Sequence, residues 1–215
     1  MKKNLTELVF ILDRSGSMVK LVEDTIGGFN GMIEKQKKLE GQALVTTVLF
    51  DDEARAIHDR LDLQEVPTLT EREYHVGGCT ALLDAVGGTI RHISKIHKYI
   101  REEDRPEKTL FVITTDGMEN ASCKYTYEKV KDMIDAQKSK GWEFIFLGAN
   151  IDAAKEAARF GIDQDLAVDY LADSTGTGVM YYALDTAISS FREDDTILKE
   201  TAWRQILDED YKNRK

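Results

Sequence analysis

A run of five apolar residues that ends in an acidic, hydroxyl-rich turn is the most constraining feature of this sequence. Leu8-Val-Phe-Ile-Leu12 leads directly into Asp13-Arg-Ser15-Gly-Ser17. A short, continuous apolar run predicts a strand buried on both faces, as in a parallel sheet covered by helices. Its end would then place one carboxylate and two hydroxyls at the mouth of the sheet. Oxygen donors of this kind suit a hard divalent cation, Mg²⁺ before Mn²⁺ or Ca²⁺.

The composition is that of one globular domain. The chain has 215 residues, 42% of them hydrophobic and 32% charged, with a formal net charge of −10. This length supports a substantial core, and the balance of apolar and charged residues argues against disorder. An acidic chain without a basic stripe is a poor candidate for binding nucleic acid or an anionic membrane. We therefore expect neither nucleic acid nor a membrane among its partners.

The sequence also predicts a cytoplasmic location. Its longest purely apolar runs are about five residues, far below the roughly 20 that cross a bilayer. Met1-Lys2-Lys3 resembles the start of a signal peptide, but Thr6, Glu7 and Asp13 interrupt the pattern. Two cysteines supply no disulfide framework and fit a reducing compartment.

Apolar runs alternate with segments of helical periodicity, which predicts an α/β fold. We expect a doubly wound, Rossmann-like three-layer sandwich with a mostly parallel central sheet and one antiparallel edge strand. The predicted strands cover residues 7–12, 43–50, 54–58 (the antiparallel edge), 110–115, 142–147 and 166–168. The predicted helices follow residue 22, residue 80, residue 126, the strand at 142–147 and the last strand. Residues 101–108 are expected to form a charged connection, and Gly27-Gly28 to allow close packing within the first helix.

Five oxygen donors are expected to meet at one edge of this sheet. Asp13 and Asp116 each follow a core strand, and Thr80 opens a helix after Gly77-Gly78. Ligands of open α/β sheets bind beyond the carboxyl ends of the parallel strands. The candidate metal ligands are therefore Asp13, Ser15, Ser17, Thr80 and Asp116.

This pattern resembles the von Willebrand factor A (VWA) domain and its metal-ion-dependent adhesion site (MIDAS). That signature is Asp-x-Ser-x-Ser, then a distant Thr, then a distant Asp. It is matched here by Asp13-Arg-Ser15-Gly-Ser17, by Thr80 in Gly-Gly-Cys-Thr-Ala-Leu and by Asp116 in Ile-Thr-Thr-Asp-Gly. The resemblance covers roughly residues 6 to 192. Among family members the chain looks most like bacterial stand-alone cytoplasmic proteins, some of them associated with tellurium resistance.

The resemblance implies a role for each matched residue. Ser15 and Ser17 would coordinate Mg²⁺ directly, and Thr80 directly or through water. Asp13 and Asp116 would act mostly through water or by hydrogen bonding to the serines. The metal would then take a further ligand from an Asp or Glu carboxylate of a partner protein. We accordingly predict a VWA-like domain over residues 1–193 and a charged tail over 194–215 that docks as a helix.

Several neighbours of the motif are expected to have no part in binding. Arg14 is predicted to be a solvated residue at the rim of the site, and His75 an uninvolved loop residue. Cys79 and Cys123 are predicted to be reduced thiols near the site. Asp51-Asp52-Glu53 is predicted to be a solvated hairpin turn.

The leading hypothesis is a Mg²⁺-dependent protein-interaction module without catalytic activity, and the alternative is a Mg²⁺-dependent hydrolase or phosphatase that uses the same metal site. A haloacid-dehalogenase-like phosphatase would need a second aspartate as general acid where this chain has Ser15. A serine-hydrolase elbow would need glycine at the positions of Asp13 and Ser17. The Gly-x-Gly-x-x-Gly of a dinucleotide site is absent after the first strand.

Overall fold

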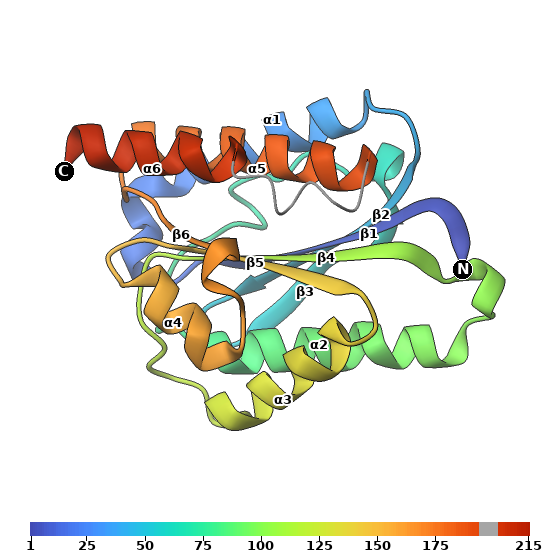
Figure 1. Ribbon diagram of the computed structural model, residues 1–215. Helices are drawn as coiled ribbons and strands as arrows, with labels where there is room; N and C mark the ends of the chain where they lie inside the picture. The colour runs from blue at the N-terminus through green and yellow to red at the C-terminus, as the bar shows by residue number, and fades with distance from the viewer. Residues whose placement is uncertain (194–201) are drawn as a thin grey trace.

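The chain forms a six-stranded sheet with helices on both faces (Figure 1). The computed structural model describes residues 1–193 and 202–215. The strand order is β3-β2-β1-β4-β5-β6, in which β3 is antiparallel to β2 and all other neighbours are parallel. The strands are β1 (Lys2–Asp13), β2 (Gln42–Phe50), β3 (Ala54–Asp62), β4 (Pro106–Thr115), β5 (Trp142–Gly148) and β6 (Ala167–Asp169). The predicted fold class, including the antiparallel edge strand, is confirmed.

Two layers of helices enclose the sheet. Figure 1 shows α1, α5 and α6 on one face and α2, α3 and α4 on the other. The helices are α1 (Val22–Gln36), α2 (Leu82–Tyr99), α3 (Tyr127–Lys138), α4 (Ala153–Phe160), α5 (Ser174–Glu193) and α6 (Ala202–Arg214). No helix in the described part of the chain combines the length and hydropathy that a membrane span requires.

The central strands are buried on both faces, as the apolar run indicated. Every residue of β1 from Leu5 to Asp13 is buried, and so are the last seven residues of β4. β1 lies between β2 and β4, with Leu12 opposite both Leu49 and Thr114. Because these strands are parallel and in register, the residues that follow them arrive at the same edge of the sheet.

Two strands begin earlier than predicted. β1 starts at Lys2, and β4 starts at Pro106, inside the segment expected to be a charged connection. Lys2 pairs with Pro106 across the sheet, and the register shifts between Lys2 and Thr6. This pairing of the first residues of two strands is a tertiary contact, which apolar patterning does not report.

Glycine allows close packing in α1, but at one of the two predicted positions. A Cβ on Gly28 would lie 2.1 Å from Cδ2 of Tyr181 in α5, whereas one on Gly27 would meet nothing within 4 Å. The prediction is therefore confirmed for Gly28 and wrong for Gly27, because only the face of α1 turned towards α5 is crowded.

The C-terminal helix α6 packs against α5 and β6, burying Trp203 and Leu207. Arg214 near its end pairs with Asp173 at 2.5 Å. The predicted tail begins at residue 194, and its first part, residues 194–201, lies outside the described residues. The domain boundary at 193/194 stays a prediction.

Candidate metal site

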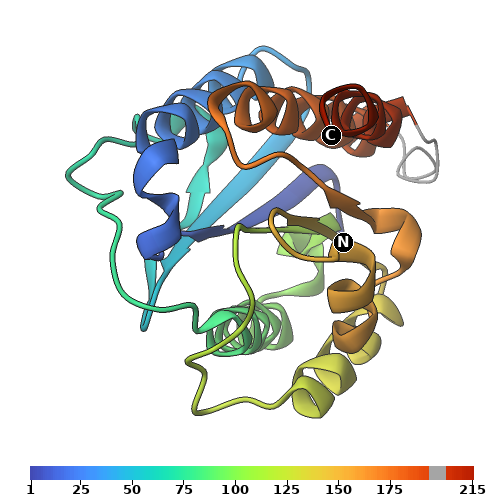
Figure 2. The same ribbon diagram turned by 90° about the vertical axis from the view of Figure 1, so that its left-hand side faces the viewer.

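The five predicted ligands lie at the carboxyl edge of the sheet, which faces the viewer in Figure 2. Asp13 is the last residue of β1, and Asp116 directly follows the neighbouring strand β4. Ser15 and Ser17 belong to the turn between β1 and α1, and Thr80 precedes α2. The two parallel strands thus bring together acids that are far apart in sequence.

Two serines and one aspartate form a chain of hydrogen bonds at this edge. Ser17 Oγ donates to Asp116 Oδ1 at 2.5 Å, and Ser15 Oγ lies 3.1 Å from Ser17 Oγ. These three side chains are therefore close enough to contribute oxygen atoms to one ion.

Asp13 is held behind this chain by protein donors. Its Oδ1 accepts the Ser15 backbone N–H at 2.7 Å, and its Oδ2 accepts the Thr115 hydroxyl at 2.6 Å. Its side chain is only 1% exposed, and burial raises the pKa of Asp13 above its ordinary value although these hydrogen bonds lower it. The carboxylate is thus oriented by two donors and is withdrawn from solvent.

The pKa of Asp116 is also raised above its ordinary value. Burial raises its pKa, as does the negative charge of Asp13, while the hydrogen bond from Ser17 lowers it. Two carboxylates whose pKa values are both raised by burial would both be stabilised in their charged form by a nearby cation. The electrostatics of the pair therefore fit a divalent ion.

Thr80 completes the group on the other side of Gly117. A Cβ placed on Gly117 would lie 3.7 Å from Thr80 Oγ1 and 4.0 Å from Ser17 Oγ. The Thr80 backbone is fixed by a two-way contact, in which its N–H donates to Asn120 Oδ1 at 2.9 Å and its carbonyl accepts from Asn120 N at 3.1 Å. The structure thus brings all five predicted ligands to one place.

The donor set consists of hydroxyls supported by acids. Within residues 1–193 and 202–215, no three His, Cys, Asp or Glu side chains gather in a way that would hold a metal ion. A metal at this edge would therefore depend on the Ser and Thr oxygens. Oxygen-only donors fit Mg²⁺, Mn²⁺ or Ca²⁺ better than soft metals.

Solved structures with the same architecture settle the fold. The vWF domain of the type V pili tip protein Mfa5 from Porphyromonas gingivalis matches with a TM-score of 0.61 at 10% identity, over 85% of this chain and 94% of that chain. The fold is that of von Willebrand factor type A domains. No protein-family model matches the sequence, and no curated protein matches it significantly.

Two further VWA-like matches were solved with metal. Proximal thread matrix protein 1 from the mussel byssus, with a zinc-occupied MIDAS motif, has a TM-score of 0.58 at 12% identity, over 86% of this chain and 46% of that chain. The manganese-loaded TRAP protein of Plasmodium vivax has a TM-score of 0.55 at 15% identity, over 83% of this chain and 72% of that chain. This chain therefore spans a little under half of the mussel protein. At these identities the likeness establishes the VWA fold.

The acidic turn after β2 supports the loop that carries Thr80. Asp52 Oδ1 accepts the Cys79 N–H at 3.0 Å, and the Asp51 carbonyl accepts the Ala81 N–H at 2.8 Å. Gly78 has φ +70°, and a Cβ there would lie 2.2 Å from Asp52 Oδ2. The predicted solvated hairpin turn is confirmed, since it joins the antiparallel strands β2 and β3 and leaves Asp52 and Glu53 exposed. The turn also hydrogen-bonds to the backbone on both sides of Thr80, which the sequence did not indicate.

Arg14 also differs from its predicted role as a solvated rim residue. Its guanidinium pairs with Asp51 at 2.9 Å, and its side chain is 15% exposed. Its backbone carbonyl accepts from Gly77 N at 2.9 Å, while Gly16 N donates to the Gly78 carbonyl at 3.2 Å. Arg14 therefore ties the Asp-x-Ser-x-Ser turn to the loops that bear Asp51 and Thr80.

The two cysteines are exposed and unpaired, and His75 is exposed. A hydrogen bond from the Cys79 side chain to the Asp52 carboxylate raises the pKa of this thiol. A raised thiol pKa disfavours the thiolate that acts as a nucleophile. Cys79 therefore lacks the lowered pKa of a reactive thiol.

Sequence reasoning missed several residues that orient the ligands. Tyr74 donates to the Asp13 carbonyl at 2.5 Å, and Asn150 Nδ2 donates to the Asp116 carbonyl at 3.3 Å. Thr115 and Asn120 act on Asp13 and Thr80 as described above. Of these residues, only Thr115 could have been found from the sequence, because it is a hydroxyl residue that ends an apolar strand and directly precedes Asp116.

Proposed function

We propose that this chain is a protein-interaction module that binds a divalent ion, Mg²⁺ before Mn²⁺ or Ca²⁺, through Asp13, Ser15, Ser17, Thr80 and Asp116. The partner would be a protein that presents an Asp or Glu carboxylate. The proposal includes a cytoplasmic location and a relation to bacterial stand-alone VWA proteins. Nucleic acid and membrane lipid are not part of it.

The observation that supports this proposal is that both carboxylates are already hydrogen-bonded to the protein, whereas the hydroxyls are neutral oxygen donors. Asp13 is engaged by Ser15 N and Thr115, and Asp116 by Ser17, so protein donors already neutralise part of each carboxylate's charge. The hydroxyls of Ser15, Ser17 and Thr80 are neutral donors. An ion bound mainly through neutral oxygens would remain electrophilic and accept an anionic group from outside.

Exposed apolar side chains flank the candidate site. Val19, two residues after Ser17, is 61% exposed, and Met118, two residues after Asp116, is 62% exposed. Both belong to segments that also carry ligands. Exposed apolar residues beside a polar centre are typical of protein-interaction surfaces. They support a partner whose acidic residue has apolar neighbours.

The role that we propose is binding without catalysis. Ser15 occupies the position where an aspartyl phosphatase would place its general acid. Around the proposed metal position, the side chains of Ser15, Ser17 and Asp116 are hydrogen-bonded in a chain. The Tyr74 hydroxyl donates to the Asp13 carbonyl.

A paired capture experiment tests the proposal. The wild-type chain is immobilised and exposed to lysate of its own host with Mg²⁺ or with EDTA, and Asp116→Ala is treated in parallel. Asp132→Ala, at an exposed position of α3, is the matched control. We expect a partner retained with Mg²⁺ by the wild type and the control, and lost with EDTA or in Asp116→Ala. A partner retained equally under all conditions would refute metal-bridged binding.

A further inference from the structure

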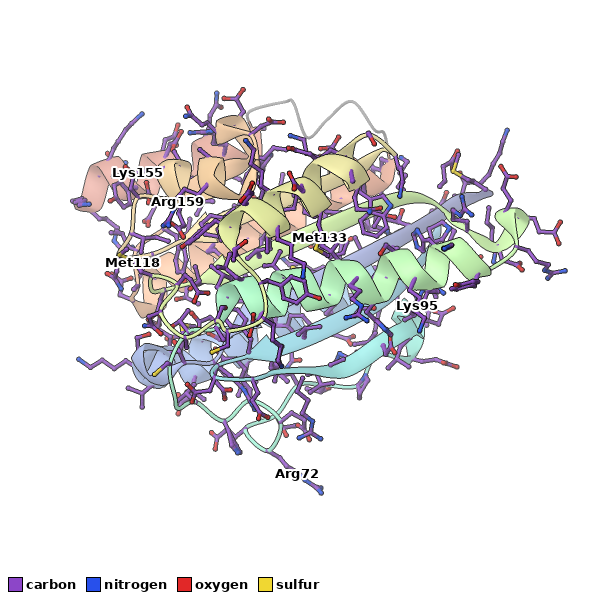
Figure 3. All side chains as sticks on the ribbon, turned by 90° about the horizontal axis from the view of Figure 1, so that it is seen from below. Arg72, Lys95, Met118, Met133, Lys155 and Arg159 are labelled. Carbon is purple, nitrogen blue, oxygen red and sulfur yellow. The ribbon has the colours of Figure 1, made fainter. Side chains whose placement is uncertain are left out.

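A cavity lies at the edge of the sheet opposite the candidate metal site. Its volume is about 580 Å³, and its lining includes Pro106 and Thr109 of β4 and Trp142 of β5. These residues stand at the amino ends of their strands, where Thr109 pairs with Trp142. The second half of α2, which bears the labelled Lys95 in Figure 3, forms one wall.

Cationic side chains dominate this lining. They come from α2, from the residue before β4 and from the segment after α3, and they are Arg91, Lys95, Lys98, Arg105 and Lys140. Within the described ranges, none of them forms an ion pair with a carboxylate. The acidic residue of the lining is Glu107, whose Oε2 accepts from the Asn4 N–H at 2.9 Å. The cavity is thus strongly basic in a chain of net charge −10.

Arg105, which lines the cavity, has an unsatisfied hydrogen-bond donor. Its Nε is buried and has no hydrogen-bond partner among the described residues. A buried guanidinium N–H is a strong, permanently charged donor. The Nε atom itself is shielded from solvent, so an anion in the cavity would interact with the rest of this half-buried guanidinium, whose charge no carboxylate of the described residues pairs.

His97 lines the cavity, but its ring already interacts with other residues of the protein. Its Nε2 lies 2.5 Å from Oε2 of the buried Glu7, and its ring packs edge-on against Trp142. His97 is therefore a structural part of the floor, and the cavity's chemistry is that of its five cations.

Compensation of helix dipoles does not account for these charges. α2 and α3 both end near the cavity, and each C-terminus is equivalent to about half a negative charge that acts within the last turn. Arg91 and Lys95 stand before that turn of α2, which ends at Tyr99, and Arg105 is on no α-helix. Five cations exceed what the two helix ends require.

We propose that this cavity binds a small anion that bears at least two phosphate groups, independently of the metal site. The cavity volume is within the range of small-molecule sites. Arg105 offers a planar fork and the lysines offer mobile point charges, both of which suit phosphate oxygens. Because the cations come from three separate segments, a ligand with two anionic groups can contact more of them than orthophosphate can.

Calorimetric titration with inorganic pyrophosphate tests this inference. EDTA is present throughout, so that metal-bridged binding at the opposite edge is excluded. We expect saturable binding by the wild type and at least tenfold weaker binding by the double variant Lys98→Gln/Lys140→Gln. Both lysines are exposed and on different segments, so their replacement leaves the core intact. Arg105→Gln should weaken binding as well.

Two controls separate this site from general charge and from the metal site. Lys155→Gln removes an exposed lysine on α4, which Figure 3 shows well apart from Lys95, and should bind pyrophosphate like the wild type. Asp116→Ala should also bind it unchanged. No saturable binding by the wild type, equal binding by the Lys98/Lys140 variant, or equal weakening by Lys155→Gln would overturn the proposal. Orthophosphate binding as tight as pyrophosphate binding would overturn the requirement for two phosphates.

Discussion

The hydroxyl of Ser17 donates to Asp116 Oδ1 at 2.5 Å across a separation of 99 residues. This contact joins the turn after β1 to the turn after β4, and it exists because the two strands are parallel neighbours in register. It gives Asp116 a partner inside the protein and leaves the second lone pair of the Ser17 oxygen free for a cation. The relationship is the basis for the first prediction.

Mg²⁺ should stabilise the fold, and Asp116→Ala should remove most of that gain. At a free-ion concentration of 100 times the dissociation constant, linkage gives about 2.7 kcal/mol. For a chain of this size that corresponds to roughly 5–10 °C in melting temperature. Thermal melts with Mg²⁺ and with EDTA measure the shift, and Asp132→Ala should retain it. A shift of the same size in Asp116→Ala would show that the ion binds elsewhere.

Thr115→Val should weaken Mg²⁺ binding without touching a proposed ligand. The change removes the 2.6 Å hydrogen bond that orients Asp13 Oδ2 while keeping the shape of the side chain. Loss of such an orienting group typically costs about 10–100-fold in metal affinity. Titration calorimetry measures it, with Thr114→Val as control, since the Thr114 side chain makes no hydrogen bond within the described residues. Equal affinity in both variants would mean that Thr115 does not orient Asp13.

Partner binding should depend on the apolar flanks of the site independently of the metal. Val19→Ser/Met118→Ser removes two apolar side chains that are mostly exposed in the free protein. We expect weaker capture of the partner in Mg²⁺ but an unchanged Mg²⁺ shift in melting temperature. Exposed Tyr182→Ser on α5 is the control. Full capture by the double variant would exclude Val19 and Met118 from the interface.

The sequence predicted the ligands well because their positions follow from backbone topology. Asp13 and Asp116 come directly after apolar strands, and parallel strands end at a common edge. The supporting contacts were not predictable in the same way. Asp52 and Tyr74 reach the site through loop conformations, and Asp52 was interpreted as part of a solvated turn because its partner, the Cys79 amide, is distant in sequence.

The same distinction explains the errors in the fold. Apolar patterning found the core of β1 and β4 but not their first residues, Lys2 and Pro106, which pair only in the tertiary structure. Adjacent glycines looked equivalent, yet only Gly28 faces Tyr181. Local pattern therefore predicts which segments are buried, whereas side-chain partners depend on how helices and loops face one another.

Gly28→Ala should destabilise the fold, whereas Gly27→Ala should not. The new Cβ at Gly28 would lie 2.1 Å from the Tyr181 ring, and α1 and α5 would have to separate. Overpacking of this kind costs about 1–3 kcal/mol in the free energy of unfolding. At Gly27 the Cβ meets nothing within 4 Å, so the higher helix propensity of alanine should add about 0.5–1 kcal/mol. Urea unfolding of both variants measures the contrast, and equal effects would contradict it.

His58 should make the fold less stable in mild acid. Burial lowers the pKa of His58 below its ordinary value, although the negative charge of Glu73 acts in the opposite direction. Its Nδ1 lies 3.0 Å from Thr47 Oγ1, opposite it on β2. Because the folded state holds this imidazole neutral, the unfolded chain binds its proton more readily. The stability that His58 contributes is therefore complete above the unfolded pKa of about 6.5 and is lost as the pH falls through and below it. Urea unfolding between pH 7.5 and about 5 should show a steeper loss for the wild type than for His58→Gln, in which no titrating group stands at this position. Parallel pH profiles would mean that the folded protein accommodates the charged imidazole.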